Sequence, residues 1–335
     1  MPTRAANGSG AAARCGAQTL ALLGSSVNVR VLRALREGPQ RQVDLRRAAG
    51  TPAQTTMRSH LRALQEIGVI VKRRRNAFPG ANTYELEKPG EELLFVARRL
   101  EQWLATAPEE PLELGSDMAK AAIRALVEGW SSTLLRAIAA RPLSLTELDR
   151  IIGDLSYPSL ERRLGAMRLT GQIKVAPAGN GKGTPYEVTE WLRRGIAPII
   201  AATRWERRNA PNTTAAIGRI DVETAFLLSV PLLELSEILS GTCQLAVELS
   251  NGTDRRLAGV MVGVEKGRIV SCTTRLAHGG NGWAIGSASA WFRSVIEADP
   301  AQLETGGDGR LARGLLEGLF QALFGAGARR SSQAV

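Results

Sequence analysis

The sequence predicts an α+β multidomain protein, with two copies of one helical module in tandem followed by a third domain of mixed helices and strands. The chain has 335 residues, more than a single hydrophobic core usually organises. Residues of structural importance recur about one hundred positions apart in its first two thirds. After residue 217 the apolar residues change from helical spacing to a mixture of helical and alternating patterns.

An internal repeat defines the two modules. A shift of 103 residues pairs Leu32 with Leu135, Pro39 with Pro142, Leu45 with Leu148, Met57 with Leu160, Leu61 with Leu164, Gly68 with Gly171, and Ile70 with Ile173. Tyr84 pairs with Tyr186 at a shift of 102, so one residue is missing from a connecting loop of the second copy.

Each module is expected to begin with three helices. Proline disfavours a helical conformation in the preceding residue, so the first helices end before Pro39 and Pro142. Ser144 or Thr146 is expected to cap the second helix of the second copy, and a glycine C-cap ends each third helix. The expected helices are Val27–Glu37, Gln42–Ala49 and one ending at Gly68, then one through Leu134, Leu135 and Ile138, one at Thr146–Ile152, and one ending at Gly171.

A β-hairpin and a fourth helix complete each module. β-Branched runs separated by Gly/Asn/Pro-rich loops predict the hairpins. Three helices followed by a hairpin are typical of a winged helix-turn-helix, whose third helix enters the DNA major groove. The expected strands are Val69–Val71 with Thr83–Leu86 and Ile173–Val175 with Tyr186–Val188, and the fourth helices are Glu91–Leu104 and Glu190–Arg207.

Proline-rich linkers and the change of pattern set the domain limits. We expect winged helix-turn-helix domains at residues 17–108 and 117–208, an α+β domain at 217–324, and flexible ends at 1–16 and 325–335. In the third domain we expect an apolar helix Phe226–Leu239 broken at Pro231, strands Cys243–Leu249, Leu257–Glu265 and Gly267–Thr273, and helices Ser287–Glu297 and Leu311–Leu323.

The positive charge is concentrated in the two modules. The net charge is +11, and residues 1–110 carry 17 Lys/Arg against 10 Asp/Glu, residues 111–210 carry 15 against 10, and the rest carry 11 against 12. A basic domain with this fold favours double-stranded DNA as the partner. The last third, which is almost neutral, is expected to have a different role.

The third helix and wing of the first module carry the groups expected to contact DNA. Met57, Leu61 and Leu64 are expected to face inward. Arginine and short hydroxyl side chains suit base edges and phosphates, although a solvated helix face would look the same. Adjacent cations on the wing indicate an anionic partner more strongly. The expected contacts are Thr55, Thr56, Arg58, Ser59 and Arg62 on the helix, and Lys72, Arg73, Arg74 and Arg75 on the wing.

The second module has a weaker version of this surface. Its expected DNA contacts are Ser159, Arg162 and Lys182, while Glu161 stands where the first copy has Arg58. The second module would therefore bind DNA more weakly, read a different half-site, or serve chiefly as a packing partner.

The start of the second module resembles HxlR-type winged-helix regulators. The segment Gly129-Trp130-Ser131-Ser132-Thr133-Leu134-Leu135-Arg136, followed by Thr146-Glu147-Leu148, carries the resemblance. The first module matches through Leu32-Arg33, with Val27 in place of the tryptophan. Cys15 lies where many such regulators have a cysteine, but the surrounding residues differ and no thiol switch is assigned. The resemblance implies dimers that bind operators, so the chain is expected to form a homodimer or an intrachain pseudo-dimer.

The last domain resembles the sterol carrier protein-like fold through Trp283-Ala284-Ile285-Gly286, Trp291-Phe292, Gly307-Asp308 and the final helix. That family encloses an apolar tunnel, which implies an apolar small-molecule effector here. A filled core is the alternative, since aromatic residues bury large areas in either case. The residues expected around the effector are Leu228, Leu232, Trp283, Trp291, Phe320 and Phe324.

Catalytic and metal-binding patterns were not found, so we expect a non-enzyme without cofactors or metals. His60 and His278 lack nearby metal-ligand partners, and His60 is interpreted as a surface residue. Three cysteines without CxxC spacing, no signal-peptide pattern and no long apolar run predict a cytoplasmic protein with no membrane contact. The leading hypothesis is a ligand-responsive transcriptional regulator. The alternatives are a winged-helix protein-assembly or nucleoid-associated protein and a lipid carrier.

Overall fold

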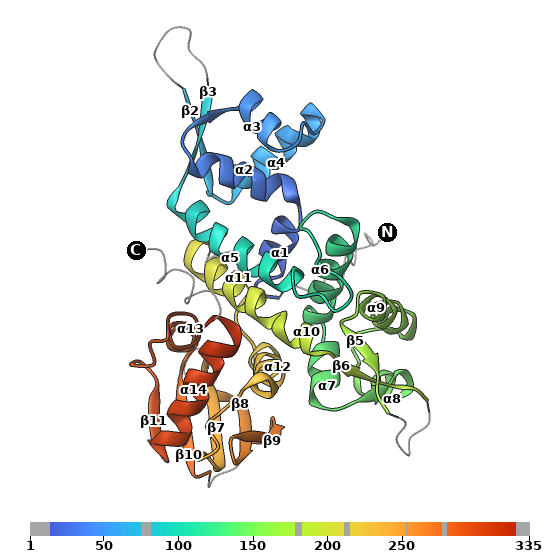
Figure 1. The fold of residues 1–335 in the computed structure, drawn as a ribbon, viewed down its shortest axis with the longest axis vertical. Helices are drawn as coiled ribbons and strands as arrows, with labels where there is room; N and C mark the ends of the chain where they lie inside the picture. The colour runs from blue at the N-terminus through green and yellow to red at the C-terminus, as the bar shows by residue number, and fades with distance from the viewer. Residues whose placement is uncertain are drawn as a thin grey trace, which may run out of the picture.

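The computed structural model describes residues 14–74, 82–177, 183–210, 215–251, 254–276 and 280–325. Within these residues it contains two three-stranded sheets and one five-stranded sheet. Each sheet belongs to a separate unit, and the three units pack against one another (Figure 1). We call them the first, second and C-terminal units in chain order.

The first unit contains the elements expected from the repeat and two additional ones, the helix α1 and the short strand β1. Its sheet has the antiparallel strand order β1-β3-β2. The elements are α1 (Ala17–Leu23), α2 (Ser26–Arg36), β1 (Gln40–Arg41), α3 (Gln42–Ala48), α4 (Gln54–Glu66), β2 (Ile70–Arg74), β3 (Asn82–Leu86) and α5 (Lys88–Leu104).

The second unit repeats this arrangement. Its strand order β4-β6-β5 corresponds to β1-β3-β2 in the first unit. The helix expected at Glu190–Arg207 is divided at Gly195 into α10 and α11. The elements are α6 (Asp117–Trp130), α7 (Leu134–Ala140), β4 (Leu143–Ser144), α8 (Leu145–Ile151), α9 (Tyr157–Leu169), β5 (Ile173–Val175), β6 (Pro185–Val188), α10 (Glu190–Arg194) and α11 (Ile196–Asn209).

Local sequence signals explain the helix ends. Ser144, one of the two expected caps, begins α8 in a capping box in which Glu147 accepts from the Ser144 backbone at 2.8 Å. Gly68 and Gly171 follow α4 and α9 with φ angles of 71° and 73°, a left-handed conformation that glycine adopts without strain. The glycine predictions are thus confirmed.

The two units meet through α5 and α11 in an arrangement that follows the repeat. Trp103 Nε1 donates to the carbonyl of Trp191 at 2.9 Å, and Trp205 Nε1 donates to the carbonyl of Pro89 at 2.8 Å. The two donors, Trp103 and Trp205, are 102 positions apart in the sequence, and so are the two acceptors, Pro89 and Trp191. This is the same shift that relates Tyr84 to Tyr186. The helices are therefore paired by an approximate intrachain two-fold relationship.

Helices α1 and α6 were not predicted from the sequence. The backbone N–H of Gly16 donates to Glu206 at 2.7 Å, and the Thr19 hydroxyl donates to the same carboxylate at 2.8 Å. Trp130 Nε1 at the end of α6 donates to the Cys15 carbonyl at 3.0 Å. Helix α1 thus depends on contacts distant in sequence, and residues 14–16, expected to be part of a flexible end, are held against α6 and α11.

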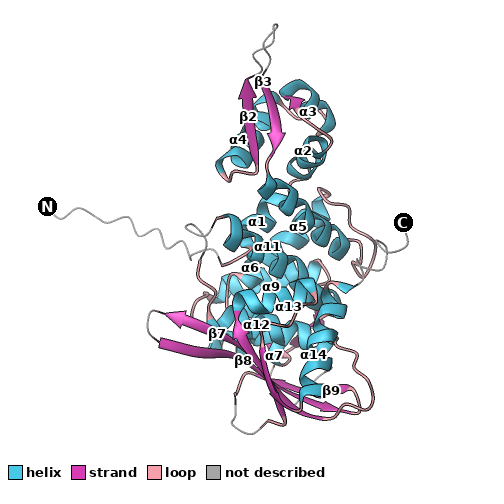
Figure 2. Ribbon diagram, turned by 90° about the vertical axis from the view of Figure 1, so that its left-hand side faces the viewer, coloured by secondary structure: helices cyan, strands magenta, loops and turns pink. Residues whose placement is uncertain are grey.

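The C-terminal unit is a five-stranded sheet covered by helices (Figure 2). Its strand order is β11-β10-β7-β8-β9, with β10 parallel to β7 and the other neighbours antiparallel. The elements are α12 (Arg219–Ser229), the 3-10 helix η1 (Val230–Leu232), β7 (Gly241–Asn251), β8 (Asp254–Glu265), β9 (Arg268–Thr273), β10 (Gly282–Ser287), α13 (Ala288–Glu297), β11 (Glu304–Gly307) and α14 (Gly309–Leu323).

One prediction for this unit was wrong, and two strands were not predicted. The helix expected at Phe226–Leu239 begins earlier and ends at Ser229, because Pro231 lies in η1 and the chain is then extended at Leu233. Strands β10 and β11 were missed. Their glycines weaken a strand pattern, yet a side chain at Gly306 would collide with the Trp283 ring across the pair.

The C-terminal unit contacts both other units. Arg136 on α7 and Arg219 both pair with Glu223, which is 1% exposed. Arg99 on α5 lies 5.1 Å from the Phe95 ring centroid and 5.0 Å from that of Phe324. Burial lowers the pKa of Arg99.

Among the described helices, none has the length and apolar character needed to cross a bilayer.

Candidate DNA-binding surface

Helix α4 presents one buried and one exposed face, as the sequence predicts. Met57, Leu61 and Leu64 are buried. Arg62 lies 3.8 Å from Glu66, but both side chains are largely exposed, so water can replace that ion pair at little cost. The predicted contact residues Thr55, Thr56, Arg58, Ser59 and Arg62 are all exposed on the other face.

His60 is not the surface residue that the sequence suggested. Its Nδ1 lies 2.8 Å from Oδ1 of Asn28, which is buried on α2 and donates to the Leu22 carbonyl at 2.7 Å. Burial lowers the pKa of His60. The interaction joins α4 to α2, so His60 positions the exposed face of α4.

The wing is formed by β2 and β3, with Lys72 opposite Tyr84 and Arg74 opposite Asn82. Arg73 Nε donates to Glu85 at 2.7 Å, and a second nitrogen lies 3.5 Å from Glu87. Lys72 and Arg74 are exposed. The register therefore distinguishes one arginine tied to its own hairpin from two cations open to a ligand. Arg75 lies outside the described residues.

The second unit has fewer exposed cations in the corresponding places. Arg162 lies 3.8 Å from Glu128, and Lys174 on β5 pairs with Glu187 at 3.1 Å. Ser159 is half-buried and accepts from Ser156 at 3.1 Å. Lys182 lies outside the described residues. Large apolar side chains are instead exposed near α9 and β5, namely Ile151, Tyr157, Leu169 and Val175.

The C-terminal unit borders an apolar chamber of about 100 Å³. Of the six residues predicted to surround an effector, Trp291 lines this chamber and the other five do not. Leu228 is fully buried, and Leu232 and Phe320 are half-buried in packing. Trp283 lies beside Gly306, and Phe324 stacks on Phe95 with ring centroids 6.3 Å apart. The predicted set therefore does not form one cavity.

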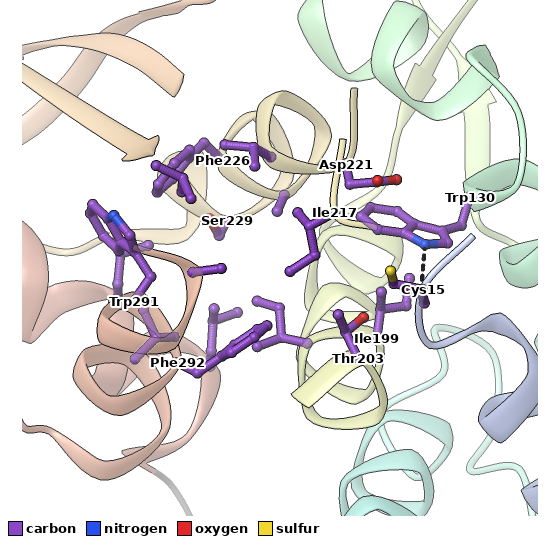
Figure 3. A pocket seen from close by; sticks show the side chains of 18 residues that line it. Cys15, Trp130, Ile199, Thr203, Ile217, Asp221, Phe226, Ser229, Trp291 and Phe292 are labelled. Carbon is purple, nitrogen blue, oxygen red and sulfur yellow. Dashed lines mark hydrogen bonds between the residues drawn. The ribbon is translucent and has the colours of Figure 1, made fainter. Parts of the chain in front are cut away.

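The chamber lies between the units (Figure 3). Cys15, Trp130 and Asp221 lie at one end, and Trp291 and Phe292 lie at the other. Burial raises the pKa of the Asp221 carboxyl, while its hydrogen bond from Gly218 and the nearby Arg14 lower it. Burial also raises the pKa of the Cys15 thiol to about 11, so this thiol is poorly suited to nucleophilic chemistry.

The tryptophans that join the two units were not predicted from the sequence. Self-comparison continued into the fourth helices would have aligned Trp103 with Trp205 at a shift of 102. Within the described residues, no cluster of three or more His, Cys, Asp or Glu side chains is arranged to hold a metal ion.

The first unit has the fold and exposed cationic face of a DNA-binding helix-turn-helix domain. Residues 22–110 match the model of the HxlR-like helix-turn-helix family. This span includes α2 to α5 and both strands of the wing. A comparison with curated proteins finds no match to the chain.

Proposed function

We propose that the protein is a sequence-specific DNA-binding transcriptional regulator in which one chain supplies two unequal winged helix-turn-helix domains, at residues 17–108 and 117–208. The observation that carries this proposal is the exposed face of α4 beside Lys72 and Arg74, within the segment that matches the HxlR-like family. Arginine reads guanine edges and hydroxyls bind phosphates, so this surface suits the DNA major groove.

The α5–α11 pairing supports an intrachain pseudo-dimer. The equivalent indole bonds of Trp103 and Trp205 join the two units as a symmetric interface would join two subunits. The chain therefore needs no second copy to present two recognition helices. A homodimer of such chains would offer four winged units.

The two units are proposed to contribute unequally. Arg58 in α4 is replaced by Glu161 in α9, whose carboxylate repels phosphates but accepts from cytosine. Arg162 is near Glu128 and Lys174 is paired with Glu187. We infer that the first unit provides most of the affinity and that the bound site is asymmetric.

An electrophoretic mobility assay tests the DNA-binding function. The full chain is mixed with DNA from upstream of its own gene in about 0.15 M salt, with a shuffled duplex of the same composition as competitor. A mobility shift that persists when the shuffled duplex is added as competitor supports the proposed regulator function. Equal competition by both duplexes, or no shift, contradicts it. The Arg58→Ala variant should reduce the difference between the duplexes.

A protein-assembly function is the second candidate. It is favoured by the large apolar residues exposed on the second unit, Ile151, Tyr157, Leu169 and Val175, because exposed apolar area is available to a protein partner. This function predicts capture of a protein partner without sequence-dependent DNA binding. The mobility assay therefore separates the two candidates.

We further propose that residues 217–324 form a sterol carrier protein-like sensor domain and that an apolar small molecule regulates DNA binding. The support is the apolar chamber beside Trp291, at the boundary between this domain and α11. A ligand shifts DNA affinity only if it favours one arrangement of the units. A lipid-carrier function would instead leave operator affinity unchanged when the chamber is filled.

A further inference from the structure

The apolar chamber adjoins a larger, arginine-lined cleft. Ile217, Ala288 and Phe292 line both spaces. The chamber measures about 100 Å³ and the cleft about 470 Å³. A ligand that lies against these shared residues would place one part among apolar side chains and another part beside cations.

The chamber is suited to one small ring. Trp130, Phe226, Trp291 and Phe292 contribute aromatic surfaces to its lining, and Phe226 meets Trp291 edge-to-face with centroids 5.0 Å apart. A dry apolar cavity of about 150 Å³ accommodates benzene. The volume of this chamber is of the same order, and it is too small for a sterol ring system.

The cleft supplies positive charge at the open side. Arg204 and Arg208 both approach Glu297, at 3.8 Å in the case of Arg208, and Arg293 pairs with Asp299. Arg207 is exposed and has no ion-pair partner within the described parts of the chain. Glu248 is the carboxylate that lines the cleft itself. Arg207 and Arg208 are therefore the cations most open to an anionic ligand.

We propose that chamber and cleft together bind a small aromatic monocarboxylate, with its ring in the chamber and its carboxylate at Arg207 and Arg208. Guanidinium–carboxylate hydrogen bonds are charge-assisted and stronger than neutral ones. Asp221 on the chamber wall is paired with Arg14 at 3.4 Å, and the described residues that line the chamber include no lysine or arginine that could bind a second carboxylate. A single acid group on a single ring thus fits both ends of the site.

The site also offers a route to regulation, and this part rests on the proposed DNA-binding function. Ile199, Ile200 and Thr203 of α11 line the chamber. On the same helix, Trp205 donates to Pro89 of the first unit, and Figure 1 shows α11 between α5 and the C-terminal unit. A ring that moves α11 would change the relative placement of the two recognition helices.

Isothermal titration calorimetry of the full chain with sodium benzoate tests the binding site, with benzyl alcohol and benzylamine as comparison probes. We expect benzoate to bind at least about tenfold more tightly than benzylamine, because a cation would face Arg207 and Arg208. Undetectable benzoate binding at millimolar concentration, or equal affinity for the three probes, overturns the proposal.

Two variants locate the binding. Ala225→Phe places a ring in the chamber wall and should weaken both benzoate and benzyl alcohol by at least about tenfold. The pair Arg207→Gln and Arg208→Gln should weaken benzoate by about tenfold and leave benzyl alcohol nearly unchanged. Arg313→Gln, at an exposed arginine on α14, is the matched control and should change neither. Unaltered benzoate affinity in the double variant contradicts the site even if Ala225→Phe fails to fold.

A mobility assay with and without benzoate then tests regulation separately. A change in DNA affinity that Ala225→Phe abolishes supports the route through α11. Benzoate binding without such a change removes the regulatory inference and leaves the site. Failure of all DNA binding, with benzoate binding intact, counts against the proposed function alone.

Discussion

Trp103 and Trp191 stack with ring centroids 4.7 Å apart, and each indole nitrogen donates to the other residue's backbone carbonyl at 2.9 Å. The pair joins the end of α5 in the first unit to α10 in the second. Trp205 makes the equivalent bond to Pro89 at the other end of the interface. Buried indole N–H groups need such partners, so these bonds fix how the two units meet.

Replacing Trp205 tests this interface. Trp205→Phe removes the bond to Pro89 and leaves unfilled volume, so the free energy of unfolding should fall by about 1–3 kcal/mol. Urea denaturation measures this loss. Trp283→Phe is the control, because Trp283 is only half-buried, and its loss should be smaller. Equal losses in the two variants would show that the Trp205 contact has no special role.

The wing cations should differ in their contribution to DNA binding, because Arg73 is paired within the hairpin and, among the described residues, Lys72 and Arg74 are not. Lys72→Gln and Arg74→Gln should each reduce the slope of log affinity for DNA against log salt by about one, the value for one lost phosphate contact. Arg73→Gln should change the slope less, because Arg73 is already bound to Glu85. Affinity measured across a salt series checks the order. A larger effect from Arg73 would contradict this description of the wing.

Arg58 should affect sequence preference as well as affinity. If Arg58 bonds a guanine, Arg58→Ala should cost about 1–3 kcal/mol on the preferred duplex and much less on a duplex substituted at that base pair. Binding of both duplexes to both proteins gives the four affinities required. A uniform loss on every duplex would place Arg58 on a phosphate.

The Cys15 thiol should make stability depend on alkaline pH. Its pKa is raised from 9.0 to about 11 in the folded chain, chiefly by burial and then by Asp221 and Glu206. Between these values the unfolded chain loses the thiol proton first, so the free energy of unfolding falls as pH rises, by about 1.4 kcal/mol per pH unit. Below pH 9 the thiol is protonated in both the folded and the unfolded chain, so it adds no pH dependence to the free energy of unfolding.

Comparison with Cys15→Ala isolates this effect, since Cys243 and Cys272 are present in both proteins. The difference in free energy of unfolding between the two proteins should be constant below pH 9. Above pH 9 the wild type should lose stability relative to Cys15→Ala. Urea denaturation from pH 7 to pH 10 gives the difference. A difference that is flat to pH 10 would mean that Cys15 is not shielded as the structure indicates.

Elements with local signals were predictable from the sequence. The repeat located α2 to α5 and their counterparts because Pro39, Pro142, Gly68 and Gly171 mark helix ends by their own backbone chemistry. The exposed face of α4 followed from helical spacing alone. The position of Ser144 at a cap also required only local sequence.

Features that depend on distant contacts were not predictable in this way. Helix α1 is held by Glu206, nearly two hundred residues away. Arg73 looked like a free cation because its pairing with Glu85 depends on the hairpin register. The sequence predicted an apolar cavity within the C-terminal unit, whereas Cys15 and Trp130 from the other two units also line the chamber in the structure. Single-sequence patterns do not contain such juxtapositions.

Selection of bound sequences from a random duplex pool by the full chain tests the central claim most directly. We expect an enriched motif with two unequal elements about 10 base pairs apart, as two linked recognition helices on one face of DNA require. Arg58→Ala should relax the stronger element. A perfectly palindromic motif would contradict the unequal intrachain pair, and the absence of any enriched motif would contradict sequence-specific DNA binding itself.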